Sequence, residues 1–308
     1  MTSLKKSFRH ISGVFLLDKP TGLSSNGALQ KVRWLFGAKK AGHTGSLDPL
    51  ASGLLPVCLG EATKFSSHLL NSDKRYIVRV RLGAETDTAD LEGLIIGSLP
   101  VPVLSPELIE SALNPLRGEI LQVPPMYSAL KHQGQRLYDL ARKGIEVVRE
   151  PRPVTIHEAK VEGFGEDWID LDVLCSKGTY IRSLAQDLGR ALGTGGHVEI
   201  LRRIQVADCE IKDAITIEAL EALALDEREA RLLPPDALVS HFPAVELDEA
   251  ATKVAGFGNP FCVVSGPDSG WVRIYGIHGF MGLGEVLEPG RIGPRRMANP
   301  ALEDVGKD

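Results

Sequence analysis

The spacing of apolar residues predicts alternating helices and strands in the first part of the chain. A helix is expected to begin at Ser24 or Ser25, because serine caps helix starts, and to run to about Phe36. Gly37 can end it, since glycine tolerates the left-handed conformation found there. Residues 53–59 are almost continuously apolar, which is typical of a buried strand. The pattern further predicts a helix over residues 61–70 and a strand over residues 76–82, in which Val78, Val80 and Leu82 share one face.

Longer strands are predicted in the middle of the chain. Residues 152–164 and 168–175 are expected to pair as a β-hairpin, and residues 179–192 to form a helix closed by Gly193. The other elements expected here are a helix over residues 106–116 and strands at residues 119–122 and around Val198 and Val206. Long hairpins with interspersed helices favour the α+β class, with a large mixed, mainly antiparallel sheet and flanking helices, over a βαβ repeat.

An acidic segment with several prolines, residues 217–243, separates two parts of the chain and is expected to be helical. Because 308 residues exceed what one core usually serves, we predict a large domain over residues 1–243 and a small one over residues 244–308. In the small domain, residues 271–275 and 280–286 are short runs broken by glycine, which is typical of a small β-barrel or sandwich. Its basic residues near the end are Arg291, Arg295 and Arg296.

The net charge of −5 hides an uneven distribution. Residues 217–249 carry nine acidic residues against two arginines, a local charge of −7, so the remainder of the chain is near +2. Residues 131–152 hold six basic residues and three acidic ones. Phosphate binding depends on such local clusters, so the acidic balance does not exclude a nucleic-acid partner. A solvated charged face is the alternative for any single cluster.

Cysteine usage and the N-terminal sequence favour a cytoplasmic protein. Four cysteines lie far apart, without a C-x-x-C pair or a histidine at ligand spacing, which argues against a disulfide framework and against a zinc site. The apolar run at residues 13–17 is too short for a signal peptide or a membrane span. We therefore expect reduced thiols, no bound metal and no association with a membrane.

One carboxylate lies in a glycine-rich loop that fits neither helix nor strand. Gly42, Gly45 and Gly53 permit positive φ and close backbone approach. Pro49 keeps the preceding residue, Asp48, in the extended region. Asp48 is therefore expected to be presented to a ligand rather than packed. A plain turn is the alternative for this loop taken alone.

Four ordered motifs resemble those of the bacterial tRNA pseudouridine synthase B (TruB) family. They are residues 18–25, residues 42–53, residues 75–90 and residues 175–185, and the resemblance spans about residues 13–203 and continues more loosely to Arg296. It implies a pseudouridine synthase fold with a central catalytic cleft and a C-terminal RNA-binding domain of the PUA type. It also implies that the T-loop uridine at position 55 of tRNA is isomerised by base flipping, cleavage of the glycosidic bond and reattachment through C5, without a cofactor.

The resemblance makes Asp48 the catalytic carboxylate. Two routes stay open, attack on the anomeric carbon of the ribose and abstraction of the 2′ proton. An adjacent guanidinium would favour the ionised carboxylate, and Arg182, at the head of a predicted helix, is the candidate. An ordinary surface ion pair is the alternative.

The remaining site residues also follow from the resemblance. Tyr76 is expected to stack on the uracil and to remove its C5 proton, although an ordinary phenol, with a pKa of about 10, is a weak base. Tyr180 is a second aromatic residue that contacts the substrate. Leu201 matches an apolar pocket wall, with simple core packing as the alternative. His43 would fill the place of the flipped base, and Lys19 is expected either to contact RNA phosphate or to be structural.

Residues 124–152 contain two prolines, mixed charge and few core residues, so they predict a mobile arm. A comparable insertion in bacterial family members closes over the T-stem loop, whereas a static surface loop is the rival interpretation. The expected partner is tRNA, bound by a monomer. The alternatives are a noncatalytic RNA-binding or tRNA-folding protein, a guide-dependent pseudouridine synthase, and a hydrolase with Asp48 as nucleophile and Asp87 or Asp90 as the second carboxylate.

Overall fold

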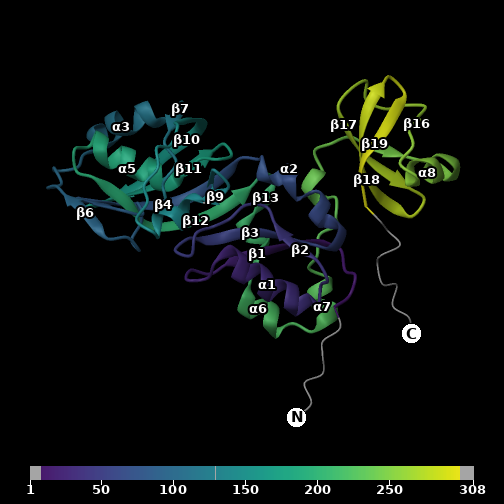
Figure 1. Ribbon diagram of the computed structural model, residues 1–308, viewed down its shortest axis with the longest axis horizontal. Coiled ribbons are helices and arrows are strands. Elements are labelled where there is room, and N and C mark those ends of the chain that lie inside the picture. Colours follow the sequence, from purple (N-terminus) through teal and green to yellow (C-terminus); the bar gives the residue numbers. More distant parts are fainter. Residues whose placement is uncertain (1–7, 129, 299–308) are drawn as a thin grey trace, which may run out of the picture. The chain divides into compact units, whose positions relative to one another are not determined.

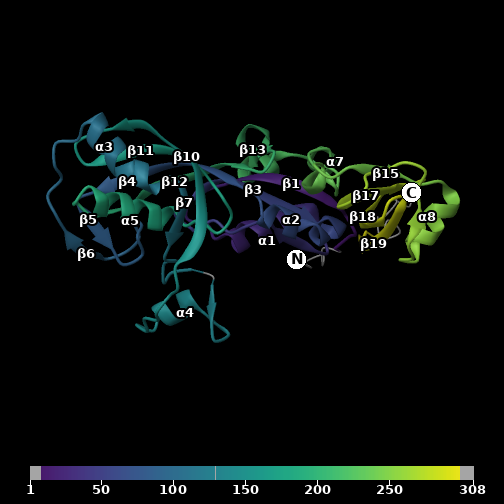
Figure 2. The ribbon, with the colours of Figure 1, turned by 90° about the horizontal axis from the view of Figure 1, so that it is seen from above.

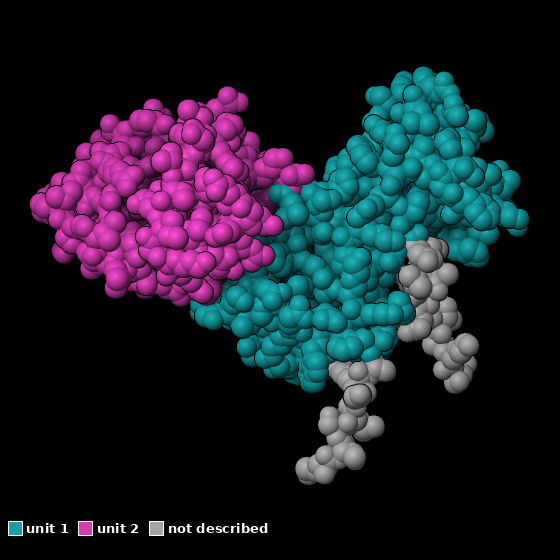
Figure 3. Space-filling model, in the orientation of Figure 1, with its two compact units in different colours: residues 1–47, 55–70, 212–308 teal, residues 48–54, 71–211 magenta. Residues whose placement is uncertain are grey.

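The computed structural model describes residues 8–128 and 130–298, and the chain forms two compact units (Figures 1 and 3). Unit 1 contains residues 1–47, 55–70 and 212–308, and unit 2 contains residues 48–54 and 71–211. These units do not coincide with the predicted boundary at residue 243, which stays a prediction. None of the described helices is long and apolar enough to cross a membrane.

Unit 2 is built on a mainly antiparallel sheet. Its strand order is β3-β12-β4-β11-β10-β7, in which β3 contributes only its first residues and pairs parallel with β12, while the other neighbours are antiparallel. This arrangement confirms the predicted mixed, mainly antiparallel sheet. Its strands are β3 (Ser52–Leu59), β4 (Lys74–Leu82), β7 (Gly118–Gln122), β10 (Arg152–Phe164), β11 (Trp168–Cys175), β12 (Gly196–Val206) and β13 (Cys209–Glu210), the last of which pairs with β12.

The alternating pattern of apolar residues explains most of these strands. Along β4 every second residue is buried, and the hairpin of β10 and β11 has the predicted bounds. The prediction of two separate strands around Val198 and Val206 was wrong, because β12 is continuous. Its pairing with β4 shifts register at residues 198–200 and 203–205, and such bulges interrupt the two-residue period that the pattern relies on.

Helices flank this sheet, and α5 (Ile181–Ala191) packs against β12. α3 (Pro106–Leu113) begins directly after its N-cap residue Ser105, whose side chain accepts a hydrogen bond from the Leu108 amide. The predicted helix over residues 106–116 ends earlier, in a 3₁₀ turn at Asn114–Leu116. Two short strands, β5 (Ala84–Thr86) and β6 (Ile95–Ser98), form a separate hairpin in unit 2.

The predicted arm projects from the sheet of unit 2 (Figure 2). It contains β8 (Lys131–His132), β9 (Gln135–Arg136) and α4 (Leu137–Ala141), and the first two pair as a small hairpin. Within the arm, Met126, Leu137 and Leu140 form a small, separate cluster of buried side chains. The arm is therefore a folded element, and its mobility stays a prediction.

Unit 1 places β1 (Gly13–Lys19) between β3 and β14 (Ile215–Thr216). As predicted, α1 (Ser25–Phe36) is capped by Ser24, whose Oγ accepts from the Gly27 amide, and it ends at Gly37 with φ 63°. β2 (Ala41–His43) pairs with the later residues of β3. The acidic segment contains α6 (Ile217–Ala222), α7 (Leu225–Glu229) and a 3₁₀ turn at Ala237–Val239.

The predicted continuous helix over residues 61–70 was wrong. A 3₁₀ helix at Gly60–Lys64 is followed by α2 (Ser66–Leu70), and Phe65 lies between them with its side chain fully buried. Phe65 packs against Val239 and Leu283, and its ring meets that of Phe280 edge to face at 5.2 Å. Tertiary packing of this ring thus overrides the local helical pattern.

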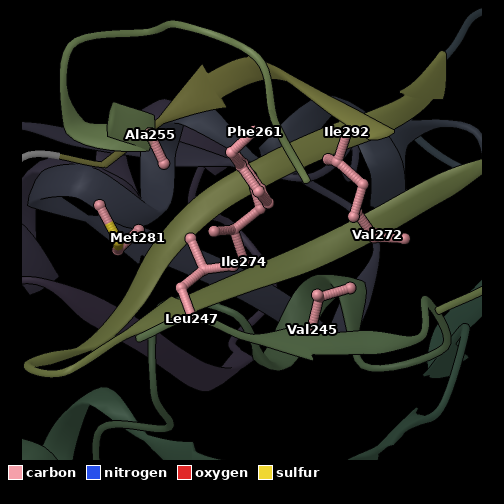
Figure 4. Close-up of a cluster of buried hydrophobic side chains, with 8 residues drawn as sticks. All are labelled: Val245, Leu247, Ala255, Phe261, Val272, Ile274, Met281 and Ile292. Carbon is pink, nitrogen blue, oxygen red and sulfur yellow. The ribbon is translucent and has the colours of Figure 1, made fainter. Parts of the chain in front are cut away.

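The C-terminal part of unit 1 is a curled sheet with the order β15-β17-β18-β19-β16 (Figure 1). Its first pair, β15 with β17, is parallel, and the others are antiparallel. The sheet confirms the predicted small β domain, and α8 (Glu249–Gly256) packs beside it. Its strands are β15 (Ala244–Glu246), β16 (Phe261–Cys262), β17 (Trp271–Gly276), β18 (Gly279–Glu288) and β19 (Arg291–Met297). Its core consists of Val245, Leu247, Ala255, Phe261, Val272, Ile274, Met281 and Ile292 (Figure 4).

Candidate active site

Asp48 and Arg182 form an ion pair in unit 2, with Arg182 Nε 3.0 Å from Asp48 Oδ2. The two side chains differ in exposure, because that of Arg182 is 6% exposed and that of Asp48 is 43% exposed. The carboxylate therefore reaches solvent while its partner is buried. This geometry agrees with the expectation that Asp48 is presented, and it excludes the ordinary surface pair considered as the alternative for Arg182.

The Arg182 guanidinium is held by four groups. Besides Asp48, Nη1 lies 3.5 Å from Asp90 Oδ2 and donates to the Thr88 carbonyl at 3.0 Å. Nη2 donates to the carbonyl of Tyr127 at 2.6 Å. A buried guanidinium is stable only when its donors are satisfied, and here every nitrogen has a partner. The direction in which Arg182 faces Asp48 is therefore fixed.

Asp90 is the partner of Arg182 that sequence reasoning missed. It is 4% exposed and its carboxylate also accepts from the Thr88 hydroxyl and, at 3.1 Å, from the Glu92 amide. The sequence suggested it only as the second carboxylate of a hydrolase, within a motif typical of a turn. The structure confirms the turn, in which Asp87 Oδ1 accepts from the Leu94 amide at 2.8 Å. The carboxylates of Asp87 and Asp90 therefore both accept hydrogen bonds within the turn.

Tyr76 lies on the buried face of β4 with 8% of its surface exposed. Burial raises the pKa of its phenol, while the charge and the hydrogen bond of Arg203 act in the opposite direction. The negative charge of Asp48 also raises this pKa. Tyr76 therefore lies within the electrostatic reach of Asp48. Its neighbour Arg203 was not indicated by any pattern in the sequence.

Tyr180 precedes α5, and the side-chain amide of Gln122 binds its backbone. Gln122 Nε2 donates to the Tyr180 carbonyl at 3.0 Å, and the Tyr180 amide donates to Gln122 Oε1 at 2.7 Å. Burial raises the pKa of the Tyr180 phenol, with Arg182 lowering it and Asp48 raising it. The structure thus brings both predicted tyrosines within the electrostatic reach of Asp48. Leu201, on β12, is 7% exposed, which suits a pocket wall and core packing equally.

The other two predicted residues belong to unit 1. Lys19 is fully buried, and its Nζ donates to the carbonyls of Pro20 at 2.8 Å and Leu23 at 2.7 Å. These bonds favour the structural role, and contact with RNA phosphate stays a prediction. His43 ends β2 and is partly exposed, with its Nδ1 3.4 Å from the Gly45 amide.

The serine of the first motif fixes the start of the Asp48 loop. Ser25 Oγ accepts from the Leu47 amide at 2.7 Å and donates to the Leu47 carbonyl at 2.9 Å. Both bonds are buried, and Leu47 is the residue directly before Asp48. The role of Ser25 in holding Leu47 could not be predicted from the sequence, because the two residues are 22 positions apart.

Three family models match successive parts of the chain and define its class as a pseudouridylate synthase. The N-terminal domain of TruB family pseudouridylate synthases matches residues 33–181, the C-terminal domain of tRNA pseudouridylate synthase B matches residues 182–240, and the C-terminal model of pseudouridine synthase II TruB matches residues 243–298. The chain belongs to the TruB family of pseudouridylate synthases.

Curated relatives cover nearly the whole chain. A tRNA pseudouridine synthase B of Methylobacillus flagellatus is 52% identical over 300 residues, covering 97% of this chain and 99% of that protein. One of Aromatoleum aromaticum is 52% identical over 298 residues, covering 96% of each. Among solved structures, a chain of a Cbf5–Nop10–Gar1 complex has a TM-score of 0.69 at 24% identity, covering 95% of this chain and 85% of that one. This last similarity shows the fold.

Proposed function

We propose that this protein isomerises the uridine at position 55 of tRNA to pseudouridine, with Asp48 as the catalytic carboxylate. The observation that carries the assignment is the ion pair between a half-exposed Asp48 and a buried, fully bonded Arg182. Relatives at about half identity over nearly the full length, all named tRNA pseudouridine synthase B, support tRNA as the substrate. We further propose that it acts in the cytoplasm as a monomer.

The reaction rearranges bonds within one nucleotide. The bond from C1′ to N1 of uracil breaks, a bond from C1′ to C5 forms, C5 loses a proton and N1 gains one. Asp48 either attacks C1′ or removes the 2′ proton, and both routes need an ionised carboxylate. Arg182 supplies the fixed positive charge that holds this carboxylate in place.

The neighbouring groups shape the pocket for the flipped base. Tyr76 offers a ring for stacking, which contributes about 1–3 kcal/mol per base, and its hydroxyl is the candidate base for C5. Tyr180 and Leu201 line the site and exclude water, which protects the cleaved sugar from hydrolysis. His43 fills the space that the base leaves in the T loop. We also propose that Tyr76, Tyr180 and Leu201 line the catalytic cleft and that the domain boundary lies at residue 243.

The Asp90→Asn variant is expected to lose turnover about tenfold while staying folded. The substitution keeps the shape of the side chain but removes one charged partner of Arg182, and a hydrogen bond to a charged group contributes about 1.5–3 kcal/mol. The rate should be measured in single turnover with saturating enzyme. Asp87→Asn, in the same turn, is the matched control and should keep its rate. Equal rates for wild type and Asp90→Asn would show that Asp90 does not support Arg182.

We propose that the arm binds the T-stem loop through its basic side chains. Lys131, Arg136, Arg142 and Lys143 line one groove on it, with Asp139 as the acidic residue. The sequence gives the arm an excess of basic residues, and Arg142 and Lys143 are exposed. Such a groove fits an RNA phosphate backbone.

The double variant Arg142→Gln with Lys143→Gln is expected to weaken tRNA binding about tenfold at moderate salt. Each phosphate contact contributes about 0.7–0.9 units to the salt slope, so the slope should fall by one to two units. Turnover at saturating tRNA should persist. Lys160→Gln with Arg190→Gln removes the same charge from exposed, acid-paired positions and is the control. An unchanged slope in the arm variant would rule out these phosphate contacts.

The C-terminal sheet is proposed as a weaker RNA-binding domain. Arg291 pairs with Glu288 and Arg295 with Glu285, each at 3.0 Å, which offsets part of the positive charge expected from the sequence. Arg296 Nε donates to the Lys64 carbonyl at 3.3 Å. These pairs support the arm, rather than the C-terminal sheet, as the main phosphate-binding element.

The experiment that tests the proposed function is incubation of the purified protein with an unmodified tRNA transcript and no other RNA. Pseudouridine at position 55 is the expected product. A noncatalytic RNA-binding protein would leave the transcript unmodified, and a guide-dependent synthase would require an added guide RNA. A hydrolase would release free uracil.

A further inference from the structure

Arg203 is the largest fully buried side chain in the described part of the chain, with 1% of its surface exposed. A buried guanidinium costs several kcal/mol unless it is paired and hydrogen-bonded. Its Nε donates to the carbonyl of Leu54 at 2.7 Å, and its side chain is hydrogen-bonded to the hydroxyl of Tyr76. A permanent cation is therefore held against one phenol of the proposed site.

The backbone around Arg203 is fixed by the adjacent strands. On β12, Arg203 is the partner of Tyr76 on β4 and of Gly53 on β3. Gly53 has φ +103°, and a Cβ placed on it would lie 2.2 Å from the Arg203 carbonyl oxygen. Only glycine permits this approach, and Gly53 closes the loop that carries Asp48. The backbone position from which the Arg203 side chain extends toward Tyr76 is therefore fixed.

Among the described residues, Arg203 is the cation that acts most strongly on the Tyr76 phenol. Burial raises the pKa of Cys175 to about 12, so this thiol stays neutral in the working range. Burial and the charge of Arg203 lower the pKa of Lys74 to about 8, so this amine loses its charge as the pH rises. Burial raises the pKa of Tyr76 and the negative charge of Asp48 adds to this rise, whereas the charge and the hydrogen bond of Arg203 lower it.

We propose that Arg203 is a positioning residue for Tyr76, which it holds by the hydroxyl and stabilises as a phenolate for removal of the C5 proton. In that step the C5–H bond breaks and its electron pair forms the C5–C6 double bond, while the electron pair of the C6–N1 double bond of the reattached base moves to N1, which takes up a proton. The C5 proton passes to the phenolate oxygen. The pairing with a guanidinium offsets part of the effect of burial, which raises the pKa of this phenol. This inference rests on the proposed function.

A double-mutant cycle tests whether Arg203 acts through the Tyr76 hydroxyl. Tritium release from tRNA labelled at C5 of uridine is measured in single turnover for Arg203→Lys and Arg203→Gln, each with Tyr76 and with Tyr76→Phe. We expect each arginine variant to slow release at least tenfold when Tyr76 is present, and less than twofold in the Tyr76→Phe background. If one arginine variant does not fold, the other completes the cycle.

The pH profile of release provides a second measurement. Removing the cation raises the pKa of the phenol, so Arg203→Gln should shift the rising limb of the rate to higher pH, and Arg203→Lys should shift it less. Arg79→Lys, on the opposite face of β4 and paired with Asp170, is the control and should leave the profile unchanged.

Additive losses in both backgrounds, or full activity of Tyr76→Phe, would overturn the inference for Arg203. Those outcomes presuppose that the wild-type protein forms pseudouridine. A wild-type protein that forms none would instead overturn the proposed function.

Discussion

The Asp48→Asn variant is expected to bind tRNA but to form essentially no pseudouridine. The substitution removes the reactive carboxylate and keeps its shape, so turnover should fall by at least about 10⁴-fold, the scale seen when a catalytic nucleophile is lost. Arg182 keeps Asp90, Thr88 and Tyr127 as partners, so the site should stay assembled. Single-turnover rates and filter-binding affinities for the same tRNA transcript provide the two measurements.

The binding measurement makes this test specific to chemistry. Asp48 is half-exposed and is paired with the buried Arg182, so the affinity for tRNA should stay within a few fold of wild type. Asp87→Asn serves again as the control for an aspartate change that does not touch Arg182. Turnover of Asp48→Asn within tenfold of wild type would remove Asp48 from the catalytic role.

The Arg182→Lys variant is expected to lose turnover by at least about 100-fold, because an ammonium cannot reproduce the planar fork of a guanidinium. Arg182 bridges two carboxylates and two carbonyls, and one lysine nitrogen cannot reach all four. Some stability should also be lost, about 1–3 kcal/mol, because Asp90 remains buried with a weaker partner. Rates and thermal unfolding curves check both effects.

The exposure of Arg182 separates a catalytic role from RNA binding. Its side chain is 6% exposed, so it offers little surface to a phosphate, and the affinity for tRNA should hardly change. Arg190→Lys, an exposed arginine on the same helix, is the matched control and should behave as wild type. A loss confined to affinity would make Arg182 a phosphate contact.

Local signals in the sequence predicted the elements whose causes are local. Ser24 and Gly37 lie directly beside the helix that they cap, so both ends of α1 could be predicted. The hairpin of β10 and β11 followed from alternation within each strand. The helix over residues 61–70 was mispredicted because burial of Phe65 against Leu283 depends on a distant part of the chain. The bulges that interrupt the alternating pattern of β12 depend likewise on its pairing with β4.

The candidate site divides in the same way. Glycine and proline around Asp48 indicate a presented carboxylate, but the loop taken alone is more typical of a plain turn. Only the family motifs tied Asp48 to Arg182. The contact between Arg182 and the Thr88 carbonyl joins residues 94 positions apart, and spacing gives no hint of it. The contacts of Asp90 and Arg203 could not be predicted from the sequence either. Folding places Asp90 beside Arg182 and Arg203 beside Tyr76.

The catalytic role of Asp48 is tested most directly by chemical mapping of pseudouridine on an unmodified tRNA transcript after incubation with the wild-type protein and, in parallel, with Asp48→Asn. We expect one modified nucleotide, at position 55 in the T loop, for the wild-type protein and none for the variant. Pseudouridine formed by Asp48→Asn at the wild-type rate, or no pseudouridine at position 55 with either protein, would contradict this expectation.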